Sequence, residues 1–441
     1  MRVWHVRKGA EAKVRRGYPW LFSNELAHSP KETEPGESIE LRDYTDAPLA
    51  FGYGHPHSLI AFRALSAGAP PADGVTQDFL FSRLKRAQDL RRALGLDQTS
   101  HRLCFAEADG LPGLIVDRYL VHREEMERGA PAQVIAIQLT TAGMERAWPM
   151  VQLALEKLLS EDKGGGAADW AHTAILLDQG SSLRALEELP VLPKAWHRLP
   201  QGGWDGTSPT QVMVSTGLGE NPIALHVDFL AGQKTGLYLD QRPNLGLAAQ
   251  ILRSWMQAGG LRKLKILDLF CYVGQWGAAL SRVAAETGAG TELLLVDASE
   301  RALELAARNC GPDAGSGATR VRTQRADILE SMEDIPAGHD VVVCDPPALV
   351  KRRKDLPKGE RAYSKLNREA LRKVRPGGLI VTCSCSGLLD EEGFREALQR
   401  AQAQSGRVVQ WIARGGQGLD HPVRAEFPEG RYLKCWIGVV P

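Results

Sequence analysis

The sequence lacks the features that mark several broad classes of protein. It has 7 cysteines in 441 residues, without a C-x-x-C pair, so neither a disulfide framework nor a cysteine-rich metal site is expected. No uncharged apolar run reaches the roughly 18 residues that a membrane span needs, and the first residues are charged where a signal peptide would be apolar. These absences predict a cytoplasmic protein without membrane contact or a bound metal.

The charge is nearly balanced over the whole chain but not along it. With 54 Lys+Arg and 53 Asp+Glu, the net charge of +1 excludes a globally basic nucleic-acid clamp. Residues 1–25 nevertheless carry six Lys or Arg against two Asp or Glu, and residues 351–375 carry eleven against three. A solvated helix face is the simplest explanation of such a run, but beside a catalytic pocket it would hold phosphates.

Sequence patterning divides the chain into three parts. Residues 1–72 contain short apolar runs separated by Gly, Pro and Asp, which predicts a small β-rich domain followed by a linker. Residues 73–200 combine amphipathic helices with a strand-like segment, which is typical of an α+β domain. In residues 201–441, strand-like and helical segments alternate, which predicts an α/β fold with a parallel sheet. The expected strands include residues 265–270, 292–296, 341–344 and 379–383.

The first expected strand of that sheet ends in a turn suited to a nucleotide. It runs through Asp268 into C-Y-V-G-Q-W-G and then a helical pattern. A glycine turn at this place lets the backbone approach a ligand beside a helix N-terminus. Because only Gly274 and Gly277 are present, the dinucleotide fingerprint G-x-G-x-x-G is absent.

Acidic residues follow the next expected strands. Asp297 ends the second strand, where a carboxylate can bind two ribose hydroxyls. Asp327 lies where a third strand should end and could accept a hydrogen bond from an adenine amine. Each residue alone is commonly a helix cap or part of a loop salt bridge, but together with Asp268 they occupy equivalent positions after alternating strands. This arrangement favours a bound nucleoside.

The fourth and fifth expected strands are followed by residues that could take part in catalysis. Asp345 is followed by two prolines that fix the backbone at the strand exit. Cys385 follows the fifth strand, whereas Cys383 is expected in the core. A thiolate that adds to C6 of cytosine makes C5 nucleophilic, and an acid such as Asp345 can support charge at N3. Cys385 is therefore a candidate nucleophile.

These motifs, taken in order, resemble class I S-adenosylmethionine-dependent methyltransferases. Longer stretches are similar to one family in that class, the bacterial large-subunit rRNA cytosine-5 methyltransferases with an N-terminal PUA domain. They span nearly the whole chain and include K-V-R-R-G-Y-P-W-L-F-S-N (13–24), E-A-D-G-L-P-G-L-I-V-D-R (107–118), G-Q-K-T-G-L-Y-L-D-Q-R (232–242), T-C-S-C-S-G-L (382–388) and H-P-V-R-A-E-F-P-E-G-R-Y-L-K (421–434).

The resemblance implies a PUA-type RNA-binding domain at 1–72, a middle domain at 73–200 and a methyltransferase domain at 201–441. It implies S-adenosylmethionine as the cofactor, Cys385 as the nucleophile, and ribosomal RNA, 23S or an assembling large subunit, as the partner, with a homodimer as one option. The donor site would comprise Lys234, Thr235, Gln241, Asp268, Phe270, Gly274, Asp297, Asp327, Asp345 and Pro346. RNA would contact Lys13, Arg15, Arg16, Lys351, Arg352, Arg353, Lys354 and Tyr363. Tyr363 and Trp276 are stacking candidates unless they are core residues.

The sequence also departs from the family and leaves alternatives open. Pro347 and Ala348 stand where the wider group often has a second cysteine, so the base that removes the C5 proton is open. Methylation of a guanine amine in rRNA would not need Cys385, although Ala348 offers no aromatic platform for that base. A small-molecule or protein methyltransferase, or an RNA-binding assembly factor with a non-catalytic donor site, are the remaining alternatives.

Overall fold

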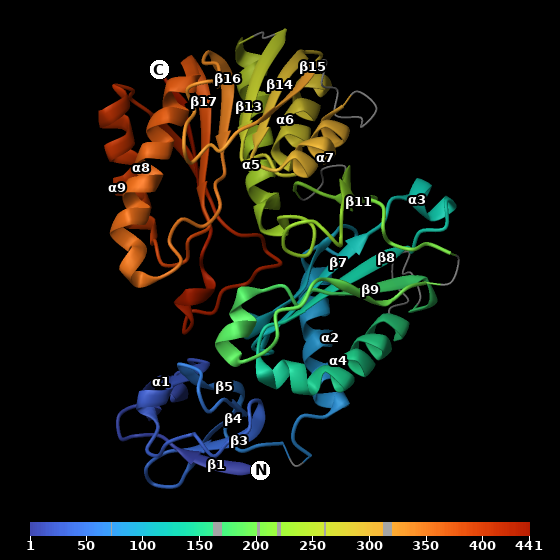
Figure 1. Cartoon of the computed structure of the whole chain (residues 1–441), viewed down its shortest axis with the longest axis vertical. Helices are drawn as coiled ribbons and strands as arrows, with labels where there is room; N and C mark the ends of the chain where they lie inside the picture. The colour runs from blue at the N-terminus through green and yellow to red at the C-terminus, as the bar shows by residue number, and fades with distance from the viewer. Residues whose placement is uncertain (72, 162–169, 201–202, 218–221, 260–261, 312–319) are drawn as a thin grey trace. The chain divides into compact units, whose positions relative to one another are not determined.

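The computed structural model describes the chain apart from residues 72, 162–169, 201–202, 218–221, 260–261 and 312–319 (Figure 1). The described residues form two compact units. The N-terminal unit comprises Met1–Thr210, Asp228–Gly236 and Leu419–Gly430, and the C-terminal unit comprises Gln211–Val227, Leu237–Gly418 and Arg431–Pro441. The expected boundaries at 72 and 201 lie on residues outside the described part.

Two five-stranded sheets build the N-terminal unit. The first has the order β1-β3-β4-β5-β2, and the second has the order β10-β9-β8-β7-β6 with helices α2 and α4 packed together against it. The elements of the first are β1 (Arg2–His5), α1 (Glu11–Arg15), β2 (Trp20–Phe22), β3 (Glu37–Arg42), β4 (Pro48–Gly54) and β5 (Ile60–Ala67). The second part contains α2 (Gln77–Ala93), β6 (His101–Phe105), β7 (Leu114–Leu120), α3 (Arg123–Glu127), β8 (Gln133–Leu139), α4 (Ala142–Glu161), β9 (Thr173–Leu177) and β10 (Ala195–Arg198).

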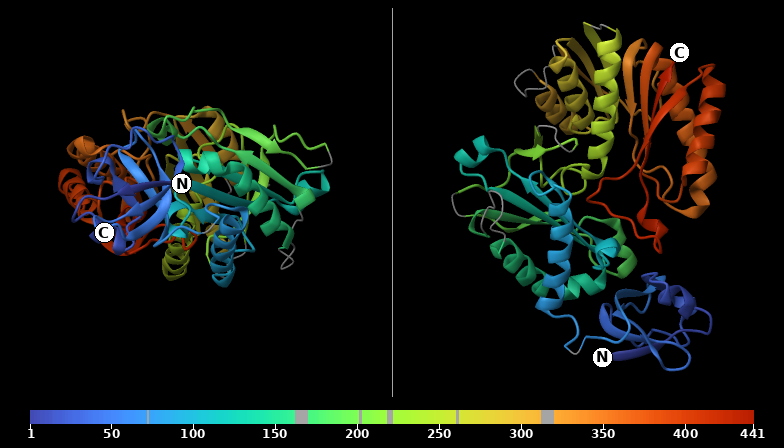
Figure 2. Two further views of the ribbon diagram at one scale, coloured as in Figure 1. Left: turned by 90° about the horizontal axis from the view of Figure 1, so that it is seen from below. Right: turned by 180° about the vertical axis from the view of Figure 1, so that it is seen from behind.

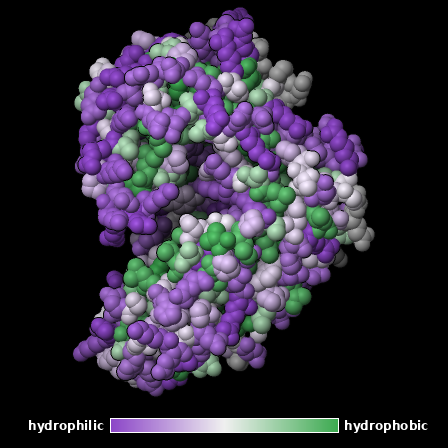
Figure 3. All heavy atoms as spheres, viewed as in Figure 1, coloured by the Kyte–Doolittle hydropathy of each residue, from purple (hydrophilic) through white to green (hydrophobic). Residues whose placement is uncertain are grey.

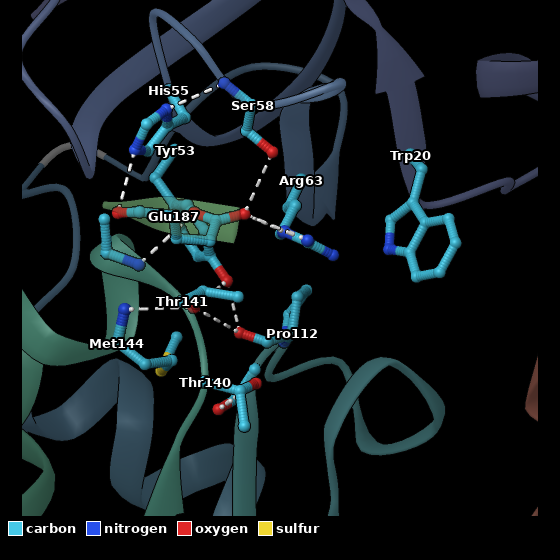
Figure 4. Close-up of polar contacts among 12 residues, drawn as sticks. Trp20, Tyr53, His55, Ser58, Arg63, Pro112, Thr140, Thr141, Met144 and Glu187 are labelled. Atoms are coloured by element: carbon cyan, nitrogen blue, oxygen red, sulfur yellow. Dashed lines mark hydrogen bonds and ion pairs between the residues drawn. The ribbon is translucent and has the colours of Figure 1, made fainter. Parts of the chain in front are cut away.

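A polar junction joins these two sheets within the N-terminal unit (Figure 4). Arg63 of β5 donates to Glu187 at 3.0 Å and to Glu107 at 3.2 Å, and the side chain of Glu187 is only 3% exposed. Tyr53 of β4 is buried, with its hydroxyl 2.9 Å from that of Thr141. Because a buried ion pair and buried hydroxyls need specific partners, this junction fixes the first sheet to the second.

A seven-stranded sheet forms the C-terminal unit, with the order β15-β14-β13-β16-β17-β19-β18. The first five strands in this order are parallel, and β19 is antiparallel to both of its neighbours. The strands are β13 (Lys263–Leu269), β14 (Gly290–Asp297), β15 (Arg320–Arg325), β16 (His339–Cys344), β17 (Val374–Ser384), β18 (Gln410–Gly415) and β19 (Lys434–Val440), and β11 (Thr210–Val214) pairs with β12 (Ile223–Val227). The helices are α5 (Arg242–Gly259), α6 (Gln275–Glu286), α7 (Glu300–Cys310), α8 (Leu356–Lys373) and α9 (Glu391–Ser405).

Helices cover both faces of this sheet (Figures 1 and 2). Helices α8 and α9 pack together, and α8 contacts β16 and β17, whereas α6 and α7 contact each other and the strands from β13 to β15. Leu267 and Leu269 belong to the core formed with α8 and α9. Because side chains alternate along a strand, the intervening Asp268 faces the opposite side, toward α6. The α/β fold with a parallel sheet, predicted from sequence, is confirmed.

Apolar residues of the described part of the chain form its buried cores, and some remain on the surface. No helix among them is both long and apolar enough to cross a bilayer. On the face drawn in Figure 3, hydrophilic residues predominate and the hydrophobic ones form small scattered groups. Scattered apolar residues of this kind are normal on a protein surface.

Candidate active site

The predicted site residues of the C-terminal unit gather at one edge of its sheet. In register, Leu269 lies beside Val296 and Cys344, and Cys344 lies beside Thr382, so β13, β14, β16 and β17 end level with one another. The strand order reverses between β13 and β16, and ligands of open α/β sheets bind at such a point. The residues placed at this edge are Asp268, Phe270, Gly274, Asp297, Asp345, Pro346 and Cys385.

The turn after β13 has an unusual backbone. Phe270, Tyr272 and Gly274 have φ angles of 60°, 49° and 78°, in the left-handed region. Non-glycine residues in this region cost about 1–3 kcal/mol each and concentrate at functional sites. A Cβ on Gly274 would lie 2.8 Å from the Cys310 sulfur and 3.1 Å from the Cα of Ala306. Glycine is therefore required by its φ angle and by packing on α7, in addition to the expected approach to a ligand.

Asp268 is buried with an unused acceptor. One carboxyl oxygen accepts a hydrogen bond from the backbone N–H of Gly277 at 3.0 Å, and the other has no partner in the described part of the chain. Burial raises the pKa of Asp268 to about 8, against the lowering effect of the Gly277 hydrogen bond. A buried acceptor of this kind can be satisfied by a cationic or amine group of a ligand. Asp268 thus fits the amino group of a methyl donor.

The two other acidic residues are held by backbone groups. Asp297 accepts hydrogen bonds from the N–H groups of Tyr272 at 3.0 Å and Ser299 at 2.9 Å, so its carboxylate is fixed against the turn after β13. Asp327 follows β15, is exposed, and accepts from the N–H of Leu329 at 3.0 Å. Both retain lone pairs that a ribose or an adenine amine could use.

The carboxylate of Asp345 is oriented by two side-chain donors. One of its oxygens accepts from Gln241 at 2.8 Å and from the indole N–H of Trp276 at 3.0 Å. Gln241 is itself fixed, because its carbonyl oxygen accepts from Asn244 at 2.6 Å. Trp276 is only 4% exposed, so it is not a stacking surface for RNA. It orients Asp345 instead, a contact that the sequence alone did not reveal.

Cys385 differs from the other cysteines in its exposure. The remaining six are buried, including Cys383, whereas Cys385 is partly exposed in the loop after β17. Its sulfur lies 3.8 Å from the carbonyl oxygen of Pro346. The structure therefore brings the candidate nucleophile next to the Asp345-Pro346 segment, as the motif order suggested.

Three expected site residues lie in other environments. Lys234 and Thr235 belong to the N-terminal unit, where Thr235 is fully buried and donates to Asp117 at 2.6 Å. Its hydroxyl is therefore already hydrogen-bonded within that unit, and the contact of Lys234 and Thr235 with the cofactor stays a prediction. Tyr363 is also fully buried, with its hydroxyl 2.9 Å from that of Ser386. The predicted contact of Tyr363 with RNA is wrong, because the ring lies in the core between α8 and α9.

The two basic runs differ in their ion pairing. In the first, Lys13 binds Glu25 at 2.6 Å and Arg15 binds Asp43, which reduces the charge near exposed Arg16. In the second, Arg368 and Arg372 pair with Glu369, and Arg375 pairs with Asp340. Four side chains at its start are exposed and form no ion pair with any residue that the structure describes. These side chains are Lys351, Arg352, Arg353 and Lys354. The start of the second run therefore keeps its positive charge.

A cavity of about 410 Å³ adjoins this second run in the C-terminal unit. Ile328, Met332, Leu349 and Leu366 give it apolar walls. The charged residues around it are Lys351, Lys358, Lys365, Glu330, Asp355 and Glu369. A cavity with apolar walls, ammonium groups and carboxylates can accept a planar, polar-edged group such as a nucleobase.

The architecture defines the class of protein. A PUA-like domain model matches residues 5–67, and a methyltransferase small domain model matches residues 235–406. A SAM-dependent methyltransferase from Streptococcus mutans superposes with a TM-score of 0.70 at 16% identity, covering 100% of both chains. A methyltransferase solved in complex with SAH gives a TM-score of 0.71 at 16% identity over the same coverage. The fold is that of a SAM-dependent methyltransferase, as expected, with S-adenosylmethionine as its methyl donor.

Sequence relatives narrow this class to one family. The chain is 32% identical over 447 residues to the ribosomal RNA large subunit methyltransferase I of Shewanella denitrificans, covering 99% of this chain and 98% of that protein. It is 31% identical over 435 residues to the protein of the same name from Cronobacter sakazakii, with 97% of each chain covered. The chain belongs to the ribosomal RNA large subunit methyltransferase I family, which confirms the predicted family.

Proposed function

We propose that this chain methylates carbon 5 of a cytosine in large-subunit ribosomal RNA, with Cys385 as the nucleophile. Its relatives are named as ribosomal RNA large subunit methyltransferases, which supports the RNA substrate. The observation that carries the cytosine-5 assignment is the partly exposed thiol of Cys385 beside the Asp345-Pro346 segment. Methylation of an amine would not require a thiol at this place.

The donor would be held at the ends of β13 and β14. Asp268 offers its unused buried acceptor to an amino group, and Asp297 and Asp327 offer carboxylates to a ribose and an adenine. Gln241, Phe270, Gly274 and Pro346 would border the same ligand. S-adenosylmethionine, when bound, supplies an electrophilic methyl group.

Cys385 and Asp345 would act on the cytosine. The Cys385 thiolate forms a bond to C6, which places electron density on C5 and lets that carbon take the methyl group. Asp345, fixed by Gln241 and Trp276, supports the charge that develops at N3. A base then removes the C5 proton, the sulfur–C6 bond breaks, and the thiolate of Cys385 is restored. A base in duplex RNA would first be flipped out.

The exposed basic run after Asp345 is the proposed RNA contact. Lys351, Arg352, Arg353 and Lys354 follow the Asp345-Pro346 segment directly, and their charges are uncompensated by ion pairs among the described residues. They can bind phosphates on either side of the target nucleotide. The adjoining cavity would accept a neighbouring base.

Labelled methyl transfer tests this function. Unmodified 23S and 16S rRNA would be incubated with labelled S-adenosylmethionine and either wild type or Cys385→Ala, and the products digested to nucleosides. We expect 5-methylcytidine from wild type and a loss of at least about a thousandfold in Cys385→Ala, because no other thiol is exposed at the site. Cys383→Ala is the control, since that thiol is buried. Another methylated nucleoside, or full activity of Cys385→Ala, would exclude the cytosine-5 mechanism.

A further inference from the structure

A buried lysine lies next to the loop that carries Cys385. Lys434 begins β19 and pairs in register with Ser384, the last residue of β17 before Cys385. Its residue is only 4% exposed. Burying an ammonium group costs several kcal/mol unless its three protons are bound, so a lysine at this position needs a structural explanation.

The ammonium group of Lys434 is bound by carbonyl oxygens. It donates to the carbonyls of Ser386 and Leu389 at 2.6 Å each and to that of Tyr432 at 2.9 Å. No carboxylate lies within ion-pair distance among the residues placed by the structure. The two acidic residues that follow Leu389 have other hydrogen-bond partners, because Asp390 caps α9 and Glu391 accepts from Trp436. The hydrogen-bond partners of this ammonium group among the described residues are therefore backbone carbonyls.

The same loop is held from its other side by a serine. The hydroxyl of Ser386 accepts from the N–H of Val350 at 3.1 Å and lies 2.9 Å from the Tyr363 hydroxyl. Val350 belongs to the segment that follows Asp345. Ser386, the residue after Cys385, is thus hydrogen-bonded to Lys434 of β19, to Tyr363 of α8 and to Val350 in the loop after β16.

We propose that Lys434 is a positioning residue for Cys385, which holds the Ser386–Leu389 turn and provides the positive charge that stabilises the thiolate. This inference rests on the proposed function of Cys385 and adds a residue to which that function assigned no role. The reaction needs the thiolate, and a nearby cation favours it over the thiol.

Charges of both signs surround this pair, because the Asp345-Pro346 segment beside Cys385 carries a carboxylate that opposes the thiolate, whereas the ammonium group of Lys434 favours it. Burial lowers the pKa of Lys434 to about 8, opposed by Cys385, Glu391 and Asp390 and reinforced by Arg431. Two tyrosines, Tyr238 and Tyr363, also face Cys385, and burial raises the pKa of both, so they stay neutral near pH 7. Since the interaction of two charges is mutual, the thiolate that raises the pKa of Lys434 is itself stabilised by the ammonium group.

Alkylation of the thiol tests this proposal without the methyl-transfer reaction. Native wild type and Lys434→Met would be treated with iodoacetamide over a series of pH values, and the Cys385 peptide quantified by mass spectrometry, with Cys385→Ser as background. We expect the alkylation midpoint of Lys434→Met to rise by about one pH unit, which is about a tenfold loss of thiolate at pH 7. Lys434→Arg should keep the wild-type midpoint or a lower one, because it remains charged.

A second buried lysine serves as the matched control. Lys373 is 9% exposed and donates to the carbonyl of Ile335, at the end of α8 that precedes β17. Lys373→Met should lower the melting temperature but leave the alkylation profile unchanged. An unchanged midpoint in folded Lys434→Met would overturn the proposal, as would a raised midpoint in Lys434→Arg if Lys434→Met does not fold. The two proposals can fail separately. If Lys434→Met shifts the alkylation midpoint but Cys385→Ala remains active, Lys434 still affects the thiol, whereas Cys385 is not the nucleophile.

Discussion

At the scale of single residues, Asp268 is a buried acid whose second carboxyl oxygen has no partner among the described residues. Asp268 lies among apolar neighbours on β13, where a carboxylate without a ligand is unfavourable. Because its folded-state pKa is raised to about 8, above the ordinary value of about 3.9, the folded chain binds more protons than the unfolded chain between these two values. Its contribution to stability is therefore lost as the pH rises through that window.

The loss of this contribution to stability at higher pH leads to a prediction for Asp268→Asn. Without donor, the melting temperature of wild type should fall from pH 5 to pH 8 more steeply than that of Asp268→Asn, because only the wild type must ionise a buried group. Differential scanning fluorimetry of both proteins across this range measures the difference. Parallel curves would contradict the raised pKa.

The same variant should bind S-adenosylhomocysteine more weakly, by about tenfold or more, since it loses the charge that attracts the amino group.

The cysteines show what sequence resolves at this scale and what it does not. Cys385 was distinguished from Cys383 because it follows the end of a strand, and the structure places Cys383 in the core and Cys385 partly exposed. Lys434 lay in a family motif but carried no signal of its role, since its partners are backbone carbonyls. Sequence does not reveal which aromatic rings are covered, so it offers both Trp276 and Tyr363 as stacking candidates, whereas both are buried in the structure.

At the scale of elements, the sequence predicts where strands lie along the chain better than it predicts which strands pair with each other. Apolar runs placed β13, β14, β16 and β17 correctly in outline, with the observed strands longer at their ends because backbone pairing continues past the apolar residues. The antiparallel pair β18 and β19 was not expected. Its position beside β17 results from pairing between segments about fifty residues apart, for which local periodicity gives no signal.

Helix α8 combines a core face with a basic face, and the basic face can be tested. Lys358 on α8 and Lys351 before it line the same cavity. We expect the double variant Lys351→Ala, Lys358→Ala to raise the KM for RNA several-fold and leave the Kd for S-adenosylhomocysteine unchanged. Each lost phosphate contact should reduce the slope of log affinity against log salt by about 0.7.

Arg262→Ala is a suitable control for this prediction. Arg262 is exposed and precedes β13, at the edge of the sheet opposite the candidate site. Removing its charge should leave both the RNA and the donor measurements unchanged. If the double lysine variant instead weakened donor binding with RNA affinity intact, the cavity would belong to the donor site.

At the scale of the whole molecule, each compact unit is built from several separate segments of the chain. Residues Asp228–Gly236 and Leu419–Gly430 belong to the N-terminal unit although the chain on both sides belongs to the C-terminal one. Both segments are bound there by buried contacts. Thr235 donates to Asp117, and the carbonyl of Asp420 accepts from the buried Arg91 at 2.7 Å. The compact units therefore do not coincide with the sequence regions on either side of the expected boundary at 201.

This arrangement predicts that a fragment of residues 201–441 is less stable than the same region in the full chain. Without residues 1–200, Thr235 and Asp420 lose their buried partners, and lost buried hydrogen bonds cost about 1–3 kcal/mol each. Thermal melts and limited proteolysis of the fragment beside the full chain would measure the difference. A fragment with an unchanged melting temperature and intact donor binding would show that the two segments contribute little.

The junction around Arg63 has a consequence for protein engineering. Chimeras between relatives are commonly built by exchanging a terminal domain at its linker, here near residue 72. In this chain the exchanged part would carry Arg63 and Tyr53 away from Glu187, Glu107 and Thr141, which lie beyond the cut. A graft that respects the linker but not these partners would bury unmatched charges. A domain exchange should therefore also transfer the residues that pair with Arg63 and Tyr53, which are Glu187, Glu107 and Thr141.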